Sequence, residues 1–485
     1  MSDAIPPDQN PSKSNVEPGS PASNAAPVNV PVNKNRSLTE GPVRAHLLRL
    51  SIPMMWGICS IILIQLIDLF YISMLGDDAL AAISFTFPIT YGIFAVFMGF
   101  GVAMSSVVSR LIGAGRYVEM HRVLFHGFIL VAGFGALSSF LGFHYAEFIF
   151  TVMGASGLVL QGTLDYMYIW FAGAVFVSLP MIGNAAIRAA GNAKIPAYIM
   201  MFSAFVNLIM DPLLIFGLLG LPEMGMRGAA LATIISYVGG LAIGLYVMIF
   251  KLKILVNPAE FGWLNDFIDS AKRLISIAAP ASLTNAIQPL LSAIITALLA
   301  TSSLQAVAAY GIVTRVEAFL FVPIMAMSTG MSPIIGQNFG AAQRERVHEA
   351  LSTTLKLAVQ WAFVTALILL VFGGLIARLF TDDPIILHIA RVYFWIVPFT
   401  YLLAHLMPIW SSAFNAMAKP HFSLAITITR MIVLGIPACW IGAHLAGAYG
   451  VFIAIASVNI LAGATIHLLS WRYAAGENRL IAAVE

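Results

Sequence analysis

Apolar runs of about 20 residues recur along this chain, and each is long enough to cross a hydrocarbon core of about 30 Å as a helix. Short polar segments separate these runs. From Leu47 onward the pattern predicts twelve membrane-spanning helices, over residues 47–74, 80–104, 122–145, 164–186, 195–218, 228–250, 274–299, 306–331, 350–377, 388–413, 422–443 and 448–470. The pattern therefore predicts an all-α polytopic membrane protein.

Composition supports this class. The alternative of a membrane-embedded enzyme would need a polar catalytic cluster at one membrane face, and the sequence shows none. Of 485 residues, 60% are hydrophobic and 10% are charged, whereas a soluble domain carries nearer a quarter charged residues. Cys59 and Cys439 both lie inside apolar segments, and no CxxC or Cys/His cluster predicts a disulfide or a metal site. The ten histidines have no metal-ligand spacing. We expect neither an enzyme nor a bound cofactor.

The predicted helices are flanked by segments of different composition. Residues 1–42 are rich in Pro, Asn, Ser and Ala, which predicts a disordered tail. This tail has no basic region followed by an apolar core, so no cleavable signal peptide is expected. Residues 251–273 are predicted to form a cytoplasmic linker between two lobes, 43–250 and 274–470. Residues 471–485 are predicted to form a cytoplasmic C-terminal tail.

Charge placement orients the helices. Alternate loops hold the basic residues Arg110, Arg116, Arg122, Arg188, Lys194, Lys251, Lys253, Lys272, Arg273, Arg344, Arg346 and Lys419. The opposite loops hold mostly acids. Basic loops stay on the cytoplasmic side of a membrane. Both termini are therefore predicted to be cytoplasmic, which is consistent with an even number of spans.

An internal repeat relates the two halves at a shift of 227 residues. Pro53 falls on Pro280, and the shift holds from Leu47 over Leu274 to His121 over His348. Six spans return the chain to its starting side, so the two lobes have the same orientation. Repeated membrane folds of this kind are typical of secondary transporters that work by alternating access.

Two lone acids lie inside apolar spans of the first lobe. Asp68 lies in span 1 and Asp211 in span 5, each about 10 Å below the outer surface at 1.5 Å per residue. Asn207 precedes Asp211 by one helical turn, and Pro212 interrupts the helical hydrogen bonding beside it. Carboxylates at such depth usually mark an ion or proton pathway. We predict that the two acids share a site for a proton or for Na⁺; the alternative interpretation is that each only bonds neighbouring helices.

The pattern resembles the multidrug and toxic compound extrusion (MATE) transporters from residue 43 to 470. The resemblance rests on the order and spacing of five segments: IDLFYISMLGDDALAA (67–82), IRAAGNAKIP (187–196), NLIMDPLLIFG (207–217), GMRGAALAT (225–233) and VTRVEAFLFVPIMAMSTGMSPIIGQNFGAA (313–342). It implies two six-helix bundles around a central cleft in the bacterial inner membrane. It also implies a monomer that exports organic, often cationic, compounds in exchange for inward H⁺ or Na⁺.

The resemblance also assigns candidate residues. The family's coupling residues correspond to Asp68, Asn207 and Asp211, and a threonine of helix 6 corresponds to Thr233. A glutamate found in helix 7 of NorM-like members is replaced by Gln288, so the DinF-like branch is the better match. Partners implied are small organic substrates and the lipid bilayer, without nucleic acid. No nucleotide-binding domain is present, so ATP is not expected to drive transport.

Other polar residues have two interpretations each. Gln65, Tyr91 and Gln288 are candidate residues of a substrate cavity, and for Gln65 and Tyr91 the alternative interpretation is packing between helices. Arg315 and Glu317 lie two residues apart on roughly opposite faces of span 8, so they need separate partners, and bracing the bundle is favoured over binding substrate. A flippase for a lipid-linked precursor is the alternative function. It would need a strongly cationic cavity, and Arg315 is the basic residue that we identify at mid-membrane.

Overall fold

The computed structural model describes residues 37–256 and 265–482, with side chains described as far as residue 474. Eleven helical stretches in this part are long and apolar enough to cross a membrane. The eleventh, Pro420–Ala474, bends at Ala446 and Gly447, where Gly447 has a φ of +56°. It therefore holds two crossings, so the described helices match the twelve predicted spans, and the all-α fold is confirmed.

The first lobe contains six of the crossings. Its elements are α1 (Val43–Ser73), α2 (Asp77–Gly113), α3 (Tyr117–Val152), α4 (Gly157–Ala189), α5 (Lys194–Ile215), the short η2 (Leu218–Gly220), α6 (Met226–Tyr246) and the π-helical turn η3 (Val247–Lys251). We call this part the N-lobe.

The second lobe begins with three long helices and continues with broken ones. Its elements are α7 (Phe267–Ala300), α8 (Leu304–Gly340), α9 (Arg344–Arg378), α10 (Pro384–Ile396), η5 (Pro398–Thr400), α11 (Tyr401–Ala404), α12 (Leu406–Ala416), α13 (Pro420–Ile428), the π-helical segment η6 (Thr429–Gly435) and α14 (Ile436–Ala482). We call this part the C-lobe. Proline interrupts the predicted tenth span, since Pro398 cannot donate a helical hydrogen bond.

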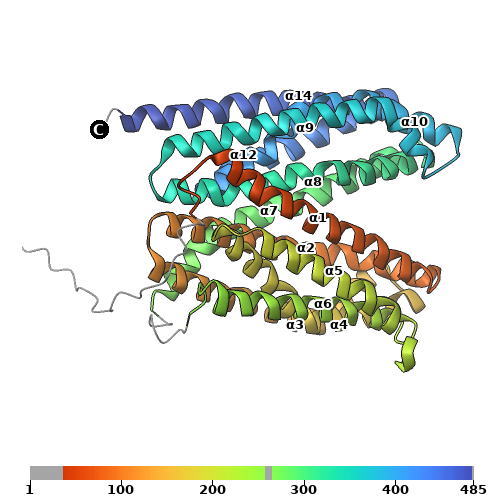
Figure 1. The fold of residues 1–485 in the computed structure, drawn as a ribbon. Coiled ribbons are helices and arrows are strands. Elements are labelled where there is room, and N and C mark those ends of the chain that lie inside the picture. Colours follow the sequence, from red (N-terminus) through yellow and green to blue (C-terminus); the bar gives the residue numbers. More distant parts are fainter. Residues whose placement is uncertain (1–36, 257–264, 483–485) are drawn as a thin grey trace, which may run out of the picture. The chain divides into compact units, whose positions relative to one another are not determined.

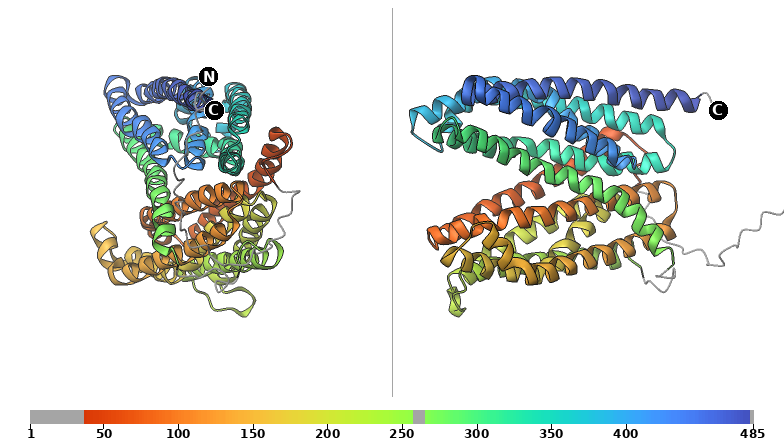
Figure 2. Two further views of the ribbon diagram at one scale, coloured as in Figure 1. Left: turned by 90° about the vertical axis from the view of Figure 1, so that its left-hand side faces the viewer. Right: turned by 180° about the vertical axis from the view of Figure 1, so that it is seen from behind.

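Helices α1 and α7 each pack in both lobes. Figure 1 shows α2–α6 gathered on one side and α8–α14 on the other, with α1 and α7 passing between them, and the views of Figure 2 agree. The first half of α1, including Leu47 and Met54, lies in the apolar core of the C-lobe, while Ile72 near its end lies in an N-lobe core. Conversely, Leu274 near the start of α7 lies in an N-lobe core and Leu299 near its end in the C-lobe.

The lobes are in contact at the end of the molecule that carries the turns α2–α3, α4–α5 and α8–α9, which we call the basic end. A Cβ atom on Gly113 would overlap the backbone carbonyl of Gln337, and one on Gly340 would overlap the carbonyl of Arg110. Only glycine lets two helix backbones approach so closely. The ends of α2 and α8 are therefore in direct backbone contact across the two lobes.

Three element boundaries differ from those predicted. Residues 37–42 were assigned to the tail, yet Leu38 is fully buried; residues 1–36 lie outside the described part of the chain. Helix α7 begins at Phe267, within the predicted linker, of which 257–264 are not described. Helix α14 continues to Ala482, and Trp471 of the predicted C-terminal tail packs against the C-lobe core.

Candidate functional site

The structure brings Asp68, Asn207 and Asp211 together in the N-lobe. Asp68 projects from α1, and the other two project from the same face of α5, one turn apart. Nδ2 of Asn207 donates a hydrogen bond of 3.1 Å to Oδ1 of Asp211. The carboxyl groups of Asp68 and Asp211 lie within hydrogen-bonding reach of each other. Asp211 is fully buried and Asp68 is half-buried.

Each of the two carboxyl groups has a buried oxygen with no hydrogen-bond partner among the described residues. These atoms are Oδ1 of Asp68 and Oδ2 of Asp211. No basic side chain in the described ranges forms a salt bridge with either group. Two adjacent carboxylates are unstable in an apolar medium unless a proton or a cation compensates their charge. The site therefore calls for a positive charge that the described protein does not supply.

Proline removes a helical hydrogen bond next to this site. Pro212 follows Asp211 directly within α5 and has no N–H group. It therefore cannot donate to the carbonyl of Leu208, which would be its helical partner one turn earlier. Carbonyl oxygens released in this way are usual ligands for cations in membrane proteins.

Two tyrosines and a threonine complete the surroundings of the acids. Tyr166 of α4 is buried, and its phenol lies close to Asp68, Asp211 and Tyr237 and within hydrogen-bonding reach of the Thr233 hydroxyl. Thr233 lies on α6 and donates to the carbonyl of Ala229 over 3.1 Å, so its oxygen can still accept. The predicted residue Thr233 is thus connected to the acids through Tyr166.

Tyr166 and Tyr237 are residues of the site that the pattern of lone acids did not predict. One signal was available, because Tyr166 and Tyr393 are separated by the same 227 residues as Pro53 and Pro280. A tyrosine repeated in both halves indicates a shared structural position. Only the packing of α4 and α6 against α5 shows that Tyr166 lies beside both carboxylates, with Tyr237 close to Tyr166.

Chemically, the site offers only oxygen and amide groups to a small cation. Two carboxyls, one amide, hydroxyls and a released carbonyl are the ligands that hard cations prefer, and the two carboxyls can equally share a proton. Within the described residues no group of three or more His, Cys, Asp or Glu side chains is placed to hold a metal ion. The arrangement thus favours reversible binding of H⁺ or Na⁺ over a transition-metal centre.

Three predicted cavity residues lie at exposed positions. Gln65 lies one turn before Asp68 on α1, Tyr91 lies on α2 with 48% of its surface exposed, and Gln288 lies on α7. Tyr91 contacts Phe87 at a ring separation of 6.2 Å. Among the described residues, no hydrogen bond joins these side chains to Asp68 or Asp211, so both interpretations of Gln65 and Tyr91 stay open.

Glu317 lies in a separate polar cluster within the C-lobe. The hydroxyl of Tyr393 donates to Oε1 of Glu317 over 2.8 Å, and the hydroxyl of Tyr401 donates to the same oxygen. Glu317 therefore connects α8 to α10 and α11. Such contacts between helices are what the structural interpretation of Glu317 predicts. Arg315 is exposed and two residues away, so it does not share these partners.

Arg430 is a second basic residue at mid-span, which sequence analysis did not single out. It lies in the π-helical segment η6, where it donates to Oδ1 of Asn459 over 3.1 Å and interacts electrostatically with Glu317. Asn459 in turn donates to Thr400 over 3.0 Å. Because its charge is matched by Glu317, Arg430 does not create the strongly cationic cavity that a lipid-precursor flippase would need.

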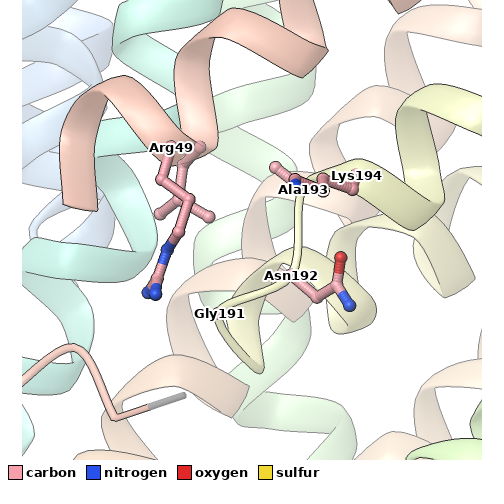
Figure 3. Close-up of a pocket in the computed structure, with 6 residues that line it drawn as sticks. Arg49, Gly191, Asn192, Ala193 and Lys194 are labelled. Atoms are coloured by element: carbon pink, nitrogen blue, oxygen red, sulfur yellow. The ribbon is translucent and has the colours of Figure 1, made fainter. Parts of the chain in front are cut away.

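A cavity of about 160 Å³ lies away from both polar clusters. It is bordered by Arg49 and Leu50 of α1 and by residues 191–194 of the α4–α5 turn. Figure 3 shows Arg49 on one side of this space and the turn on the other. None of its lining residues belongs to the candidate site. The acids of the N-lobe rather than this cavity therefore carry the chemistry.

The fold and the site define a two-lobe helical transporter of the membrane, with a buried acidic site in its first lobe. The MatE family model matches residues 53–213 and 280–441, which is more than half of the chain and one match in each lobe. The chain belongs to the MATE family. It is a multi-pass membrane transporter rather than an enzyme.

Curated relatives and solved structures agree with this family. The chain is 37% identical over 439 residues to the FAD transporter of Shewanella oneidensis, covering 90% of this chain and 96% of that protein. It is 28% identical over 419 residues to the multidrug export protein MepA of Staphylococcus haemolyticus, covering 85% and 90%. The crystal structure of the Vibrio cholerae MATE transporter VcmN in its bent form superposes with a TM-score of 0.84 at 29% identity, covering 90% and 98%.

Proposed function

We propose that this chain is a secondary active antiporter that exports organic compounds in exchange for inward H⁺ or Na⁺. The observation that carries the proposal is the pair of buried, unpartnered oxygens on Asp68 and Asp211. A proton or a sodium ion entering this pair removes an unfavourable charge arrangement. In this proposal, the N-lobe does not hold the cation and the substrate at the same time. Cation entry therefore requires substrate release, which couples the two fluxes.

Alternating access fits the way the two lobes pack. They are in backbone contact at the basic end, which the positive-inside rule assigns to the cytoplasm. In the proposed cycle this contact breaks when the site opens to that side, and both termini face the cytoplasm of a bacterial inner membrane. We further propose that the chain works as a monomer, with one coupling site in its own N-lobe.

The identity of the substrate is the finer part of the proposal. The relative with 37% identity is an FAD transporter, whereas MepA is a multidrug export protein at 28% identity. We propose a flavin dinucleotide as the first substrate to test and organic cations as the second. Flavin dinucleotides are anionic, so coupling through an acidic site separate from the substrate would avoid direct repulsion between the two.

The test is transport from proteoliposomes loaded with FAD or with a fluorescent organic cation. Imposed gradients of H⁺ and of Na⁺ are applied separately to wild type, Asp68→Asn and Asp211→Asn. Asp165→Asn serves as the control, since Asp165 is a carboxyl of the same lobe whose charge is paired with Arg227 at 2.7 Å. We expect both site variants to bind substrate but to lose gradient-driven transport, while the control retains it.

Two results would contradict this proposal. If Asp68→Asn and Asp211→Asn transport as well as wild type, the acids are structural and coupling lies elsewhere. If wild type moves neither substrate under either gradient, the antiport function itself is wrong. The gradient that drives export identifies the coupling ion.

A further inference from the structure

Leu38 is packed inside the molecule although it precedes the first helix. Its side chain has 0% exposure and belongs to the apolar core formed largely by the C-lobe. That core includes Ile334 of α8, Leu351 of α9 and Trp410 of α12, and it also includes Ala193 of the α4–α5 turn in the N-lobe. The segment before α1 therefore belongs to a core to which residues of both lobes contribute.

The backbone of Leu38 is bound by side chains at the basic end of the C-lobe. Its N–H donates to Oε1 of Gln337 over 3.1 Å. Its carbonyl accepts from Nδ2 of Asn338 over 3.1 Å and from Arg346 over 3.3 Å. Gln337 and Asn338 are buried, so these bonds are shielded from water. Two amide side chains thus satisfy both backbone groups of one residue, as a neighbouring β-strand would.

Gln337 also reaches the N-lobe. Its Nε2 donates over 2.7 Å to the carbonyl of Ala189 at the end of α4. One side chain therefore bonds Leu38 with its oxygen and the N-lobe with its nitrogen. If the lobes separate at the basic end, the bond to Ala189 breaks and the space around Leu38 opens to water.

We propose that Gln337, Asn338 and Arg346 form a binding site for a bent peptide segment with a leucine side chain. In this chain, residues 37–41 occupy the site and latch the two lobes together at the basic end. The latch holds because separation exposes a buried leucine and leaves buried amide groups without partners. This latch keeps the basic end of the transporter closed. It depends on the proposed alternating access in one respect, because the two lobes must separate at the basic end.

Cysteine accessibility tests this latch without any gradient or substrate. In a background with Cys59→Ser and Cys439→Ala, the reporter is Ser109→Cys, a nearly isosteric change on α2. Ser109 has 0% exposure and lies against Gly336 of α8 across the interface. The labelling rate by a water-soluble maleimide then measures how often the lobes separate.

Leu38→Asp is compared with Glu40→Gln, a matched control because Glu40 is exposed two residues away. We expect Leu38→Asp to raise the labelling rate by roughly tenfold or more, since burying one leucine shifts a two-state equilibrium by about that factor. A synthetic peptide of residues 33–42 at about millimolar concentration, matching the effective concentration of a tethered segment, should restore slow labelling. The same peptide carrying Leu38→Asp should not.

Unchanged labelling in a folded Leu38→Asp protein would overturn the proposal. So would faster labelling that the peptide does not reverse, because that indicates general destabilisation instead of a vacated site. Should Leu38→Asp fail to fold, deletion of residues 2–41 removes the segment without placing a charge in the core, and the same two expectations apply. This experiment measures labelling and not transport. It can therefore contradict the latch without contradicting the proposed antiport function, and the transport assay can do the reverse.

Discussion

Asn207 donates a 3.1 Å hydrogen bond to Oδ1 of Asp211, while Oδ2 of the same carboxyl is buried with no partner among the described residues. The amide thus fixes one oxygen of the carboxyl and leaves the other available to a ligand. A rigid carboxyl with one unused oxygen is preorganised for a small cation, because little ordering is left to be done on binding.

Replacing Asn207 tests this preorganisation. Asn207→Ala should change binding of the driving cation by roughly tenfold, since a hydrogen bond to a charged group contributes about 1.5–3 kcal/mol. It should weaken Na⁺ binding, because the carboxyl of Asp211 is no longer held in place, and strengthen H⁺ binding, because the lost hydrogen bond stabilised the charged carboxylate. Asn207→Asp should strengthen binding of either cation, because a third carboxyl adds negative charge to the site. The measurement is the cation concentration that gives half-maximal transport. Equal concentrations for wild type and Asn207→Ala would show that the amide does not position Asp211.

The phenol of Tyr166 should support the same site. Tyr166→Phe keeps the ring but removes the hydroxyl that reaches Thr233, so we expect transport to fall several-fold with a stability loss of about 1 kcal/mol. Tyr168→Phe is the control on the same helix, since that ring stacks on Phe143 at 5.7 Å. Transport rates and thermal unfolding in detergent are measured together. An effect as large in Tyr168→Phe would mean that α4 is generally sensitive.

Close contact between α2 and α8 should not tolerate a side chain at Gly113. In Gly113→Ala the new Cβ overlaps the carbonyl of Gln337, so the lobes must shift at a cost of about 1–3 kcal/mol. Gly133→Ala on α3 is the control, because its Cβ would meet nothing nearby and alanine favours a helix by up to about 1 kcal/mol. Thermal unfolding distinguishes them: Gly113→Ala should lower the midpoint and Gly133→Ala should not. Equal midpoints would refute the tight interface.

Charge pairing within the C-lobe predicts a coupled response of Glu317 and Arg430. Arg430→Met removes a positive charge that interacts with Glu317 without forming a salt bridge, and it should destabilise the protein by about 1 kcal/mol. Adding Glu317→Gln should recover much of this loss, because the amide needs no counter-charge and can still accept from Tyr393. A double-mutant cycle on unfolding free energies gives the coupling, and exposed Arg315→Met is the control. Strictly additive effects would show that the two residues do not interact.

The recurrence of long apolar runs was sufficient to predict most of the fold. Twelve apolar runs of spanning length require helices, because a lipid-exposed backbone must satisfy its hydrogen bonds internally. Isolated acids such as Asp68 and Asp211 stood out for the same reason, since a charge within an apolar run is expensive. Their equal depth predicted that they meet. Tyr166, Tyr237 and Arg430 carried no comparable signal, because tyrosine and a single arginine are common in such helices.

By itself, then, the sequence determined the helices, the repeat and the acidic residues of the N-lobe, since each follows from local apolarity or from spacing. Only the tertiary structure decided which lobe each half of α1 and α7 packs in. A uniformly apolar helix has no polar face, so its sequence does not indicate which neighbouring helix it contacts. The tertiary structure alone also placed Leu38 in a buried site. The contacts of that residue come from Gln337, Asn338 and Arg346, some 300 positions away, and no local pattern records a pairing at that distance.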